Sequence, residues 1–73
     1  MKTLKIYFHP DDLQKVNDLL SGMEYRWGYG MESVLGRSMK ILFIEGSDIT
    51  LGALVYRFGL NEVRIAKIEF VSN

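Results

Sequence analysis

Hydrophobic and polar residues follow two different periods along the chain, which predicts a mixture of strands and helices. Four segments alternate apolar and polar side chains or are almost continuously apolar, as strands are. Two other segments carry apolar residues three and four positions apart, as helices do. The expected strands span residues 2–8, 24–34, 39–45 and 62–71, and the expected helices span residues 13–23 and 49–60.

The first expected helix has a single apolar face and a polar back. Asp11 and Gln14 have the spacing of a capping box, so we expect Asp11 to cap the start of this helix. Gly22 is expected to end it. Asp12 belongs to the side that we expect to stay in water, and the apolar stripe consists of Leu13, Val16, Leu19, Leu20 and Met23. This pattern is typical of a helix that covers a core from one side.

The second expected helix is apolar on two opposite faces, and its sequence, ITLGALVYRFGL, carries one charge, Arg57. One face has the spacing of a core stripe, at Leu51, Leu54, Val55 and Phe58. A helix that is apolar on both sides must be covered on both sides, and a chain of 73 residues has little protein with which to do so. We therefore expect the second face to bind a protein partner. This predicted interface comprises Ile49, Gly52, Ala53, Tyr56 and Leu60.

The predicted fold depends on whether residues 49–58 form a helix or a strand. This segment contains good strand formers, and Gly52 costs a helix about 1 kcal/mol relative to alanine. A strand here would give a mostly β meander. We favour a helix because strand alternation would bury Leu51 and Val55 while exposing Leu54 and Phe58.

With a helix at residues 49–60, the order of elements is β-α-β-β-α-β. This order is that of a ferredoxin-like sandwich, in which two helices lie on one face of a four-stranded antiparallel sheet. We expect a single small α+β domain of this type over residues 1–73.

Aromatic residues concentrate in the second expected strand, where they alternate with Gly28 and Gly30. The glycines indicate a bulge, a strong twist or the close approach of another backbone. On the open face of the sheet, beside cations, the aromatic rings would resemble the base-stacking surface of RNA-recognition domains. The residues expected on such a nucleic-acid or partner face are Lys5, Tyr7, Tyr25, Arg26, Trp27, Tyr29 and Lys40. Packing of the same rings within the core is the alternative.

Composition narrows the classes of function. Nine basic and nine acidic side chains give no net charge, which disfavours a dedicated nucleic-acid binder. The absence of cysteine excludes thiol catalysis and a Cys-based zinc site, and fits a reducing compartment. No apolar run resembles a signal peptide or a membrane span. We therefore expect a cytoplasmic protein that makes no membrane contact.

No recognisable catalytic motif occurs in the sequence. The one histidine, His9, lies close to Asp11 and Asp12, but we expect these residues to shape a loop and a helix start rather than to hold a metal or transfer protons. Two negative charges also disfavour phosphate binding in this loop. The G-x-G at residues 28–30 precedes no helix start. We expect no enzyme activity, no cofactor and no metal.

The remaining features favour a small regulatory or inhibitory protein that acts by protein binding, a description that small phage or bacterial accessory proteins fit. Tyrosine, tryptophan and methionine, which are enriched in interface cores, are grouped in residues 25–31. The expected partner is a second copy of the chain or a different protein. Binding of single-stranded RNA or DNA through the open sheet face is the alternative function.

Overall fold

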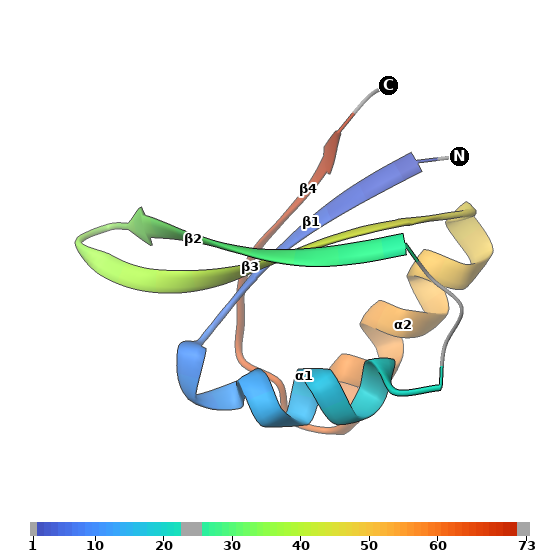
Figure 1. Cartoon of the computed structure of the whole chain (residues 1–73), viewed down its shortest axis with the longest axis horizontal. Helices are drawn as coiled ribbons and strands as arrows, with labels where there is room; N and C mark the ends of the chain where they lie inside the picture. Colours follow the sequence, from blue (N-terminus) through green and yellow to red (C-terminus); the bar gives the residue numbers. More distant parts are fainter. Residues whose placement is uncertain (1, 23–25, 72–73) are drawn as a thin grey trace.

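Strands and helices follow one another in the order that the hydropathy pattern predicts. The computed structural model describes residues 2–22 and 26–71. Over these residues the fold is a small α+β fold with a four-stranded antiparallel sheet and two helices (Figure 1). Strands β1 to β4 span Lys2–Phe8, Arg26–Val34, Arg37–Gly46 and Ile65–Val71, helices α1 and α2 span Leu13–Leu20 and Asp48–Leu60, and a short 3-10 turn, η1, spans Pro10–Asp12.

The strand order in the sheet is β2-β3-β1-β4, and each neighbouring pair is antiparallel. β2 and β4 are therefore the two edge strands. Both helices lie on the same side of the sheet, and no described residue forms a helix on its other face (Figure 1). The β2–β3 hairpin continues past the end of β1, since the last β1 residue, Phe8, pairs with Lys40 while β3 begins at Arg37.

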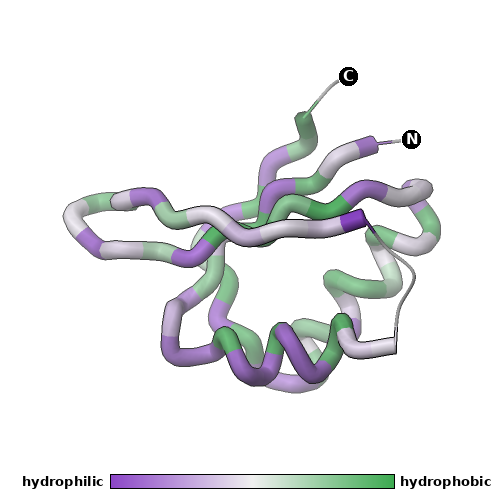
Figure 2. The backbone as a smooth tube through the Cα atoms, viewed as in Figure 1, coloured by the Kyte–Doolittle hydropathy of each residue, from purple (hydrophilic) through white to green (hydrophobic). Residues whose placement is uncertain are grey.

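The hydrophobic core fills the space between the sheet and the helices. Alternate residues of β1 and β3 enter it, and the helices supply the rest. The stripe predicted for the second helix is confirmed, with Val55 at its partly buried border. The fully buried core side chains include Leu4, Ile6, Phe8, Val16, Leu20, Leu42, Ile44, Leu51, Leu54 and Phe58. Figure 2 shows the apolar residues of α1 interrupted by polar ones, whereas α2 is more uniformly apolar.

The segment at residues 49–60 is a helix, as predicted, and its start has a clear cap. The Ser47 hydroxyl accepts a hydrogen bond from the backbone N–H of Thr50, at 3.3 Å. Asp48 follows in the first turn, where its carboxylate interacts favourably with the positive end of the helix dipole. Within the described residues, neither α2 nor α1 has both the length and the apolar composition needed to cross a membrane.

The start of α1 differs from the prediction. Asp11 forms no capping box with Gln14, whose side chain bonds Asp18 instead. The chain first makes the 3-10 turn η1, which is capped by His9: its Nδ1 accepts a hydrogen bond from the backbone N–H of Asp11, at 3.2 Å. The prediction that Asp12 stays in water is also wrong, because Asp12 is buried against Arg64.

Two connections, the one between β2 and β3 and the one before β4, contain residues with positive φ that the sequence pattern does not indicate. β2 and β3 are joined by a two-residue turn, Leu35-Gly36, with φ of 53° and 78°. Positive φ at both central residues is typical of the type I′ turn that joins tightly paired strands. Before β4, Glu62 has a φ of 58°, so the strand begins at Ile65, three residues later than expected.

Candidate functional site

The second face of α2 is exposed to solvent. Ile49 is 85% exposed and Tyr56 is 68% exposed, although both are large apolar side chains. Leu60, Gly52 and Ala53 are exposed as well. All five residues of the predicted interface are therefore accessible on one helix. A contiguous patch of large exposed apolar side chains is typical of a surface that binds a protein, a membrane or a ligand.

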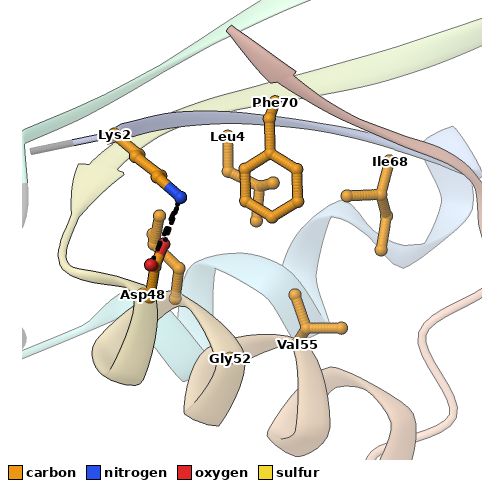
Figure 3. Close-up of a pocket in the computed structure, with 8 residues that line it drawn as sticks. Lys2, Leu4, Asp48, Gly52, Val55, Ile68 and Phe70 are labelled. Carbon is orange, nitrogen blue, oxygen red and sulfur yellow. Dashed lines mark hydrogen bonds and ion pairs between the residues drawn. The ribbon is translucent and has the colours of Figure 1, made fainter. Parts of the chain in front are cut away.

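An apolar groove runs beside this helix, between α2 and the edge strand β4. Its volume is about 510 Å3. Figure 3 shows Phe70 and Ile68 pointing from β4 toward Gly52 and Val55 of α2. Lys2, Leu4, Asp48 and Leu51 complete the lining. Because α2 leaves this side of β4 partly uncovered, Phe70 remains 67% exposed and Ile68 40% exposed.

An ion pair closes one end of the groove. Lys2 Nζ lies 3.1 Å from Oδ1 of Asp48 and 3.2 Å from Oδ2 (Figure 3). The same ammonium lies 5.7 Å from the centre of the Phe70 ring, within the range of a cation–π interaction. Both charged side chains are more than half exposed, so the pair contributes little to stability. It does give the groove one polar end.

The opposite face of the sheet holds a charged cluster around Tyr7. Two ammonium groups lie close to the ring of Tyr7, with Lys5 Nζ 5.4 Å and Lys67 Nζ 5.3 Å from its centre. Its hydroxyl donates to Oε2 of Glu32, at 3.1 Å. The Lys67 ammonium lowers the pKa of Glu69, and this carboxylate in turn raises the pKa of Lys67. Tyr7 is only 2% exposed, so its ring has no free face on which a nucleic-acid base could stack.

The predicted nucleic-acid or partner face is divided between the two sides of the sheet. Lys5 and Tyr7 lie on the face without helices, as expected. Arg26 lies on that face too, because it pairs in register with Glu45, which pairs with Thr3, two residues before Lys5. Tyr25 lies outside the described residues.

Trp27, Tyr29 and Lys40 lie on the helix side instead, so the expectation that they share a face with Lys5 is wrong. Trp27 and Tyr29 pair with Ile44 and Leu42, both core residues. The Tyr29 hydroxyl donates to Oδ1 of Asn17 on α1 at 2.5 Å, and its ring meets Phe8 edge-on. Lys40 pairs with Phe8.

The glycines of β2 fit this phase. With the aromatic rings turned to the helices, Gly28 and Gly30 fall on the other face, where Gly28 pairs with Phe43 of β3. A Cβ on Gly30 would lie 3.0 Å from Cε2 of Phe43. The close approach at Gly30 is made by a side chain and not by another backbone, as the prediction had it. Nucleic-acid binding by the face without helices stays a prediction. Among the described residues, Phe43 is the one partly exposed aromatic ring on that face.

His9 and the neighbouring aspartates perform structural roles. His9 caps η1, and Asp12 accepts hydrogen bonds from Nε and Nη2 of Arg64 at 3.0 and 3.1 Å and from its backbone N–H at 2.9 Å. These bonds lower the pKa of Asp12 from its ordinary value of 3.8 to about 2. Within residues 2–22 and 26–71, no three His, Cys, Asp or Glu side chains gather as a metal site would require.

Sequence reasoning missed the β4 side of the groove. In the register of β1 and β4, Ile68 and Phe70 lie on the same side of the sheet as Ile6 and Leu4. Nothing in the local pattern indicates that α2 would leave them exposed. Comparison of the sequence with protein-family models and with curated proteins gives no match. The geometry of this surface is therefore the basis for proposing a function.

Proposed function

We propose that the chain is a non-catalytic protein-interaction module, regulatory or inhibitory in role. Its contact surface is the exposed face of α2 together with the groove beside it. The observation that carries the proposal is the row of exposed apolar residues along α2, next to a groove whose other wall, Ile68 and Phe70, is also exposed. We call these residues the α2–β4 surface: Ile49, Gly52, Ala53, Val55, Tyr56, Leu60, Ile68 and Phe70.

The composition of this surface supports protein binding more than binding of a charged ligand. Its members are apolar or aromatic, with one ion pair at an end. Interface cores are depleted in charged residues and enriched in aromatic ones. Tyr56 and Phe70 are the two exposed rings of the surface, and rings of this kind supply most of the binding energy in many interfaces.

We also assign the fold to the ferredoxin-like βαββαβ type as part of this proposal. The order of elements, the antiparallel pairing of neighbouring strands and the placement of both helices on one side support the assignment. Since this fold hosts many unrelated activities, the function is argued from the α2–β4 surface rather than from the fold.

Site-specific photo-crosslinking tests the proposed function. A photoreactive amino acid at position 56 should give a discrete protein adduct in an extract of the source cell. The matched control carries the same group at position 14, on the exposed side of α1. No adduct at position 56, or adducts of equal yield at both positions, would contradict the proposal. The mass of the adduct also tells a second copy from a different protein.

A further inference from the structure

We infer that the partner of the α2–β4 surface is a second copy of this chain, joined through antiparallel pairing of the two β4 strands in a register centred on Ile68. This inference rests on the proposed protein-interaction function and names its partner. It places the two protomers about a two-fold axis at Ile68, so that the two sheets form one continuous sheet.

The outer edge of β4 is available for such pairing. β4 is the last strand of the sheet, and its only strand neighbour within the described residues is β1. An uncovered edge strand presents unpaired backbone N–H and C=O groups to any strand that approaches. The exposed side chains of Ile68, Phe70 and Val71 border this edge.

The charges of β4 are self-complementary about Ile68. In a two-fold antiparallel pair centred there, Lys67 lies directly opposite Glu69 of the partner subunit, and Glu69 lies opposite the partner's Lys67. Both side chains are on the face without helices and are partly exposed, so they can reach across the strand pair. Opposite charges placed directly across a strand pair stabilise it.

The neighbouring symmetric registers are disfavoured by the same residues. A pair centred on Lys67 places the two Lys67 side chains opposite each other, and a pair centred on Glu69 does the same with two carboxylates. Like charges directly opposite destabilise a strand pair. The charges of β4 thus select one register, whereas in many proteins charges on an edge strand serve to prevent pairing altogether.

The apolar side of β4 is complementary in size in this register. Ile68 meets the partner's Ile68. Phe70 lies opposite Ala66 of the partner subunit, which is the residue at the register shift of β4, between Lys67 paired with Tyr7 and Ile65 paired with Phe8. A small residue opposite a large one leaves room for the phenyl ring at the mouth of the partner's groove. Pairing would therefore cover two side chains, Ile68 and Phe70, that the monomer leaves exposed.

The other edge strand is less suited to a dimer. The symmetric register of β2 that pairs Arg26 with the partner's Glu32 also pairs Gly28 with the partner's Gly30. Two glycines supply no side-chain contact at that position, and glycine weakens a strand. The pocket beside β2 is also smaller, at about 230 Å3, and its lining includes the charged side chains of Arg26 and Glu45.

Complementation between two charge variants tests the register. Lys67→Glu places four carboxylates at the proposed interface, and Glu69→Lys places four ammonium groups there. Each variant alone should self-associate about tenfold more weakly than the wild type. An equimolar mixture of the two should regain dimer affinity to within about threefold of the wild type, because both cross-strand pairs become Glu–Lys again.

Sedimentation velocity on each variant, on the mixture and on the wild type measures these affinities. The mixture restores only contacts between chains, so recovery cannot come from the Lys67–Glu69 pair within one chain. A mixture no tighter than its components would overturn the inference. So would variants that dimerise like the wild type, or a wild type that stays at the 8.4 kDa mass of one chain at high micromolar concentration.

A disulfide gives a second, geometric test in a chain that has no cysteine of its own. In the proposed register the two Cα atoms at position 68 are about 4.5–5.5 Å apart, within reach of a disulfide. Ile68→Cys should therefore form a covalent dimer on mild oxidation. The control Val71→Cys, also at a partly exposed β4 position, would place its two sulfurs about 20 Å apart and should not crosslink. A dimer that crosslinks through position 71 and not through 68 would overturn the register.

The two proposals fail in different ways. An adduct at position 56 with a different protein, together with a monomeric wild type, would overturn the second-copy inference and leave the protein-interaction function supported. Absence of any adduct at position 56 would contradict the proposed function itself. A dimer that lacks crosslinking at both 68 and 56 would mean that another surface, such as β2, joins the chains.

Discussion

At Asp12, one carboxylate accepts three hydrogen bonds from Arg64, which lies 52 residues further along the chain. The two residues fix the end of η1 to the segment that leads into β4. Lys15 adds a longer ion pair, with its Nζ 3.9 Å from Oδ1 of Asp12. Since Asp12 is buried, its charge is compatible with folding only because these partners satisfy it.

Stability should depend on the ionisation of Asp12 between pH 4 and pH 2. The folded pKa of about 2 lies below the ordinary value of 3.8, so this carboxylate stabilises the fold above pH 4 and loses its contribution as the pH falls toward 2. We expect Asp12→Ala to lower the free energy of unfolding by about 2–3 kcal/mol at neutral pH. In urea titrations between pH 7 and pH 2, the free energy of unfolding of Asp12→Ala should also fall less steeply with pH than that of the wild type. Asp11→Ala, which removes an exposed carboxylate next to it, should change little.

Gly46 is a second residue whose identity the packing dictates. It ends β3, where a Cβ would lie 2.9 Å from Oγ1 of Thr50 and 3.3 Å from Cδ2 of the buried Leu51. We expect Gly46→Ala to lower the free energy of unfolding by about 1–3 kcal/mol, as overpacking does. Gly28→Ala is the matched control in another strand, because a Cβ there would meet nothing within 4 Å. Equal effects in chemical denaturation would contradict this account.

At the scale of elements, the β2–β3 hairpin carries a local cost at its tip. Leu35 occupies a backbone conformation that favours glycine and asparagine, and its side chain is 99% exposed. The residue therefore gains nothing from burial that would offset the strain. Leu35 is therefore a position at which a substitution can relieve backbone strain without loss of packing.

We expect Leu35→Asn to raise the free energy of unfolding by about 1 kcal/mol. Asparagine tolerates positive φ and is favoured in the two-residue turns that join hairpins. The control Leu35→Ala removes the same apolar surface but keeps the conformational penalty, so it should give no gain. The melting temperatures of the two variants test this expectation. Equal stabilisation by both would mean that the gain comes from removing the exposed leucine side chain and not from relief of backbone strain.

At the scale of the whole molecule, we expect α2 to separate folding from the proposed association. One of its faces completes the core and the other lies on the α2–β4 surface. A helix built in this way allows contacts with a partner to be changed without unfolding the chain. This separation makes the surface testable by single substitutions.

Tyr56→Glu and Phe58→Glu should differ sharply although they are two residues apart. Tyr56 is largely exposed, so its substitution should change the free energy of unfolding by less than about 0.5 kcal/mol while weakening association. Phe58 is fully buried, and a carboxylate there should prevent folding. Circular dichroism together with sedimentation checks both expectations. Unfolding of Tyr56→Glu would mean that this face belongs to the core.

The hydropathy pattern determined the elements because each depends on its neighbours in sequence. Leu4, Ile6 and Phe8 alternate and therefore share one side of a strand, and Leu51, Leu54 and Phe58 share one side of a helix. The exposed face of α2 followed from the same periodicity. Which side of β2 the rings of Trp27 and Tyr29 occupy could not be obtained in this way, because both phases of an alternating strand fit the local pattern.

Only the tertiary structure decided what lies between the elements. The pairing of Asp12 with Arg64, the groove between α2 and β4, and the contact of Phe43 with Gly30 all join residues distant in sequence. Such contacts depend on strand order, register and the angle at which α2 crosses the sheet, none of which a local period encodes. The sequence alone determined the apolar face on α2, and the fold placed it beside an open edge strand whose charges can pair with their own copy.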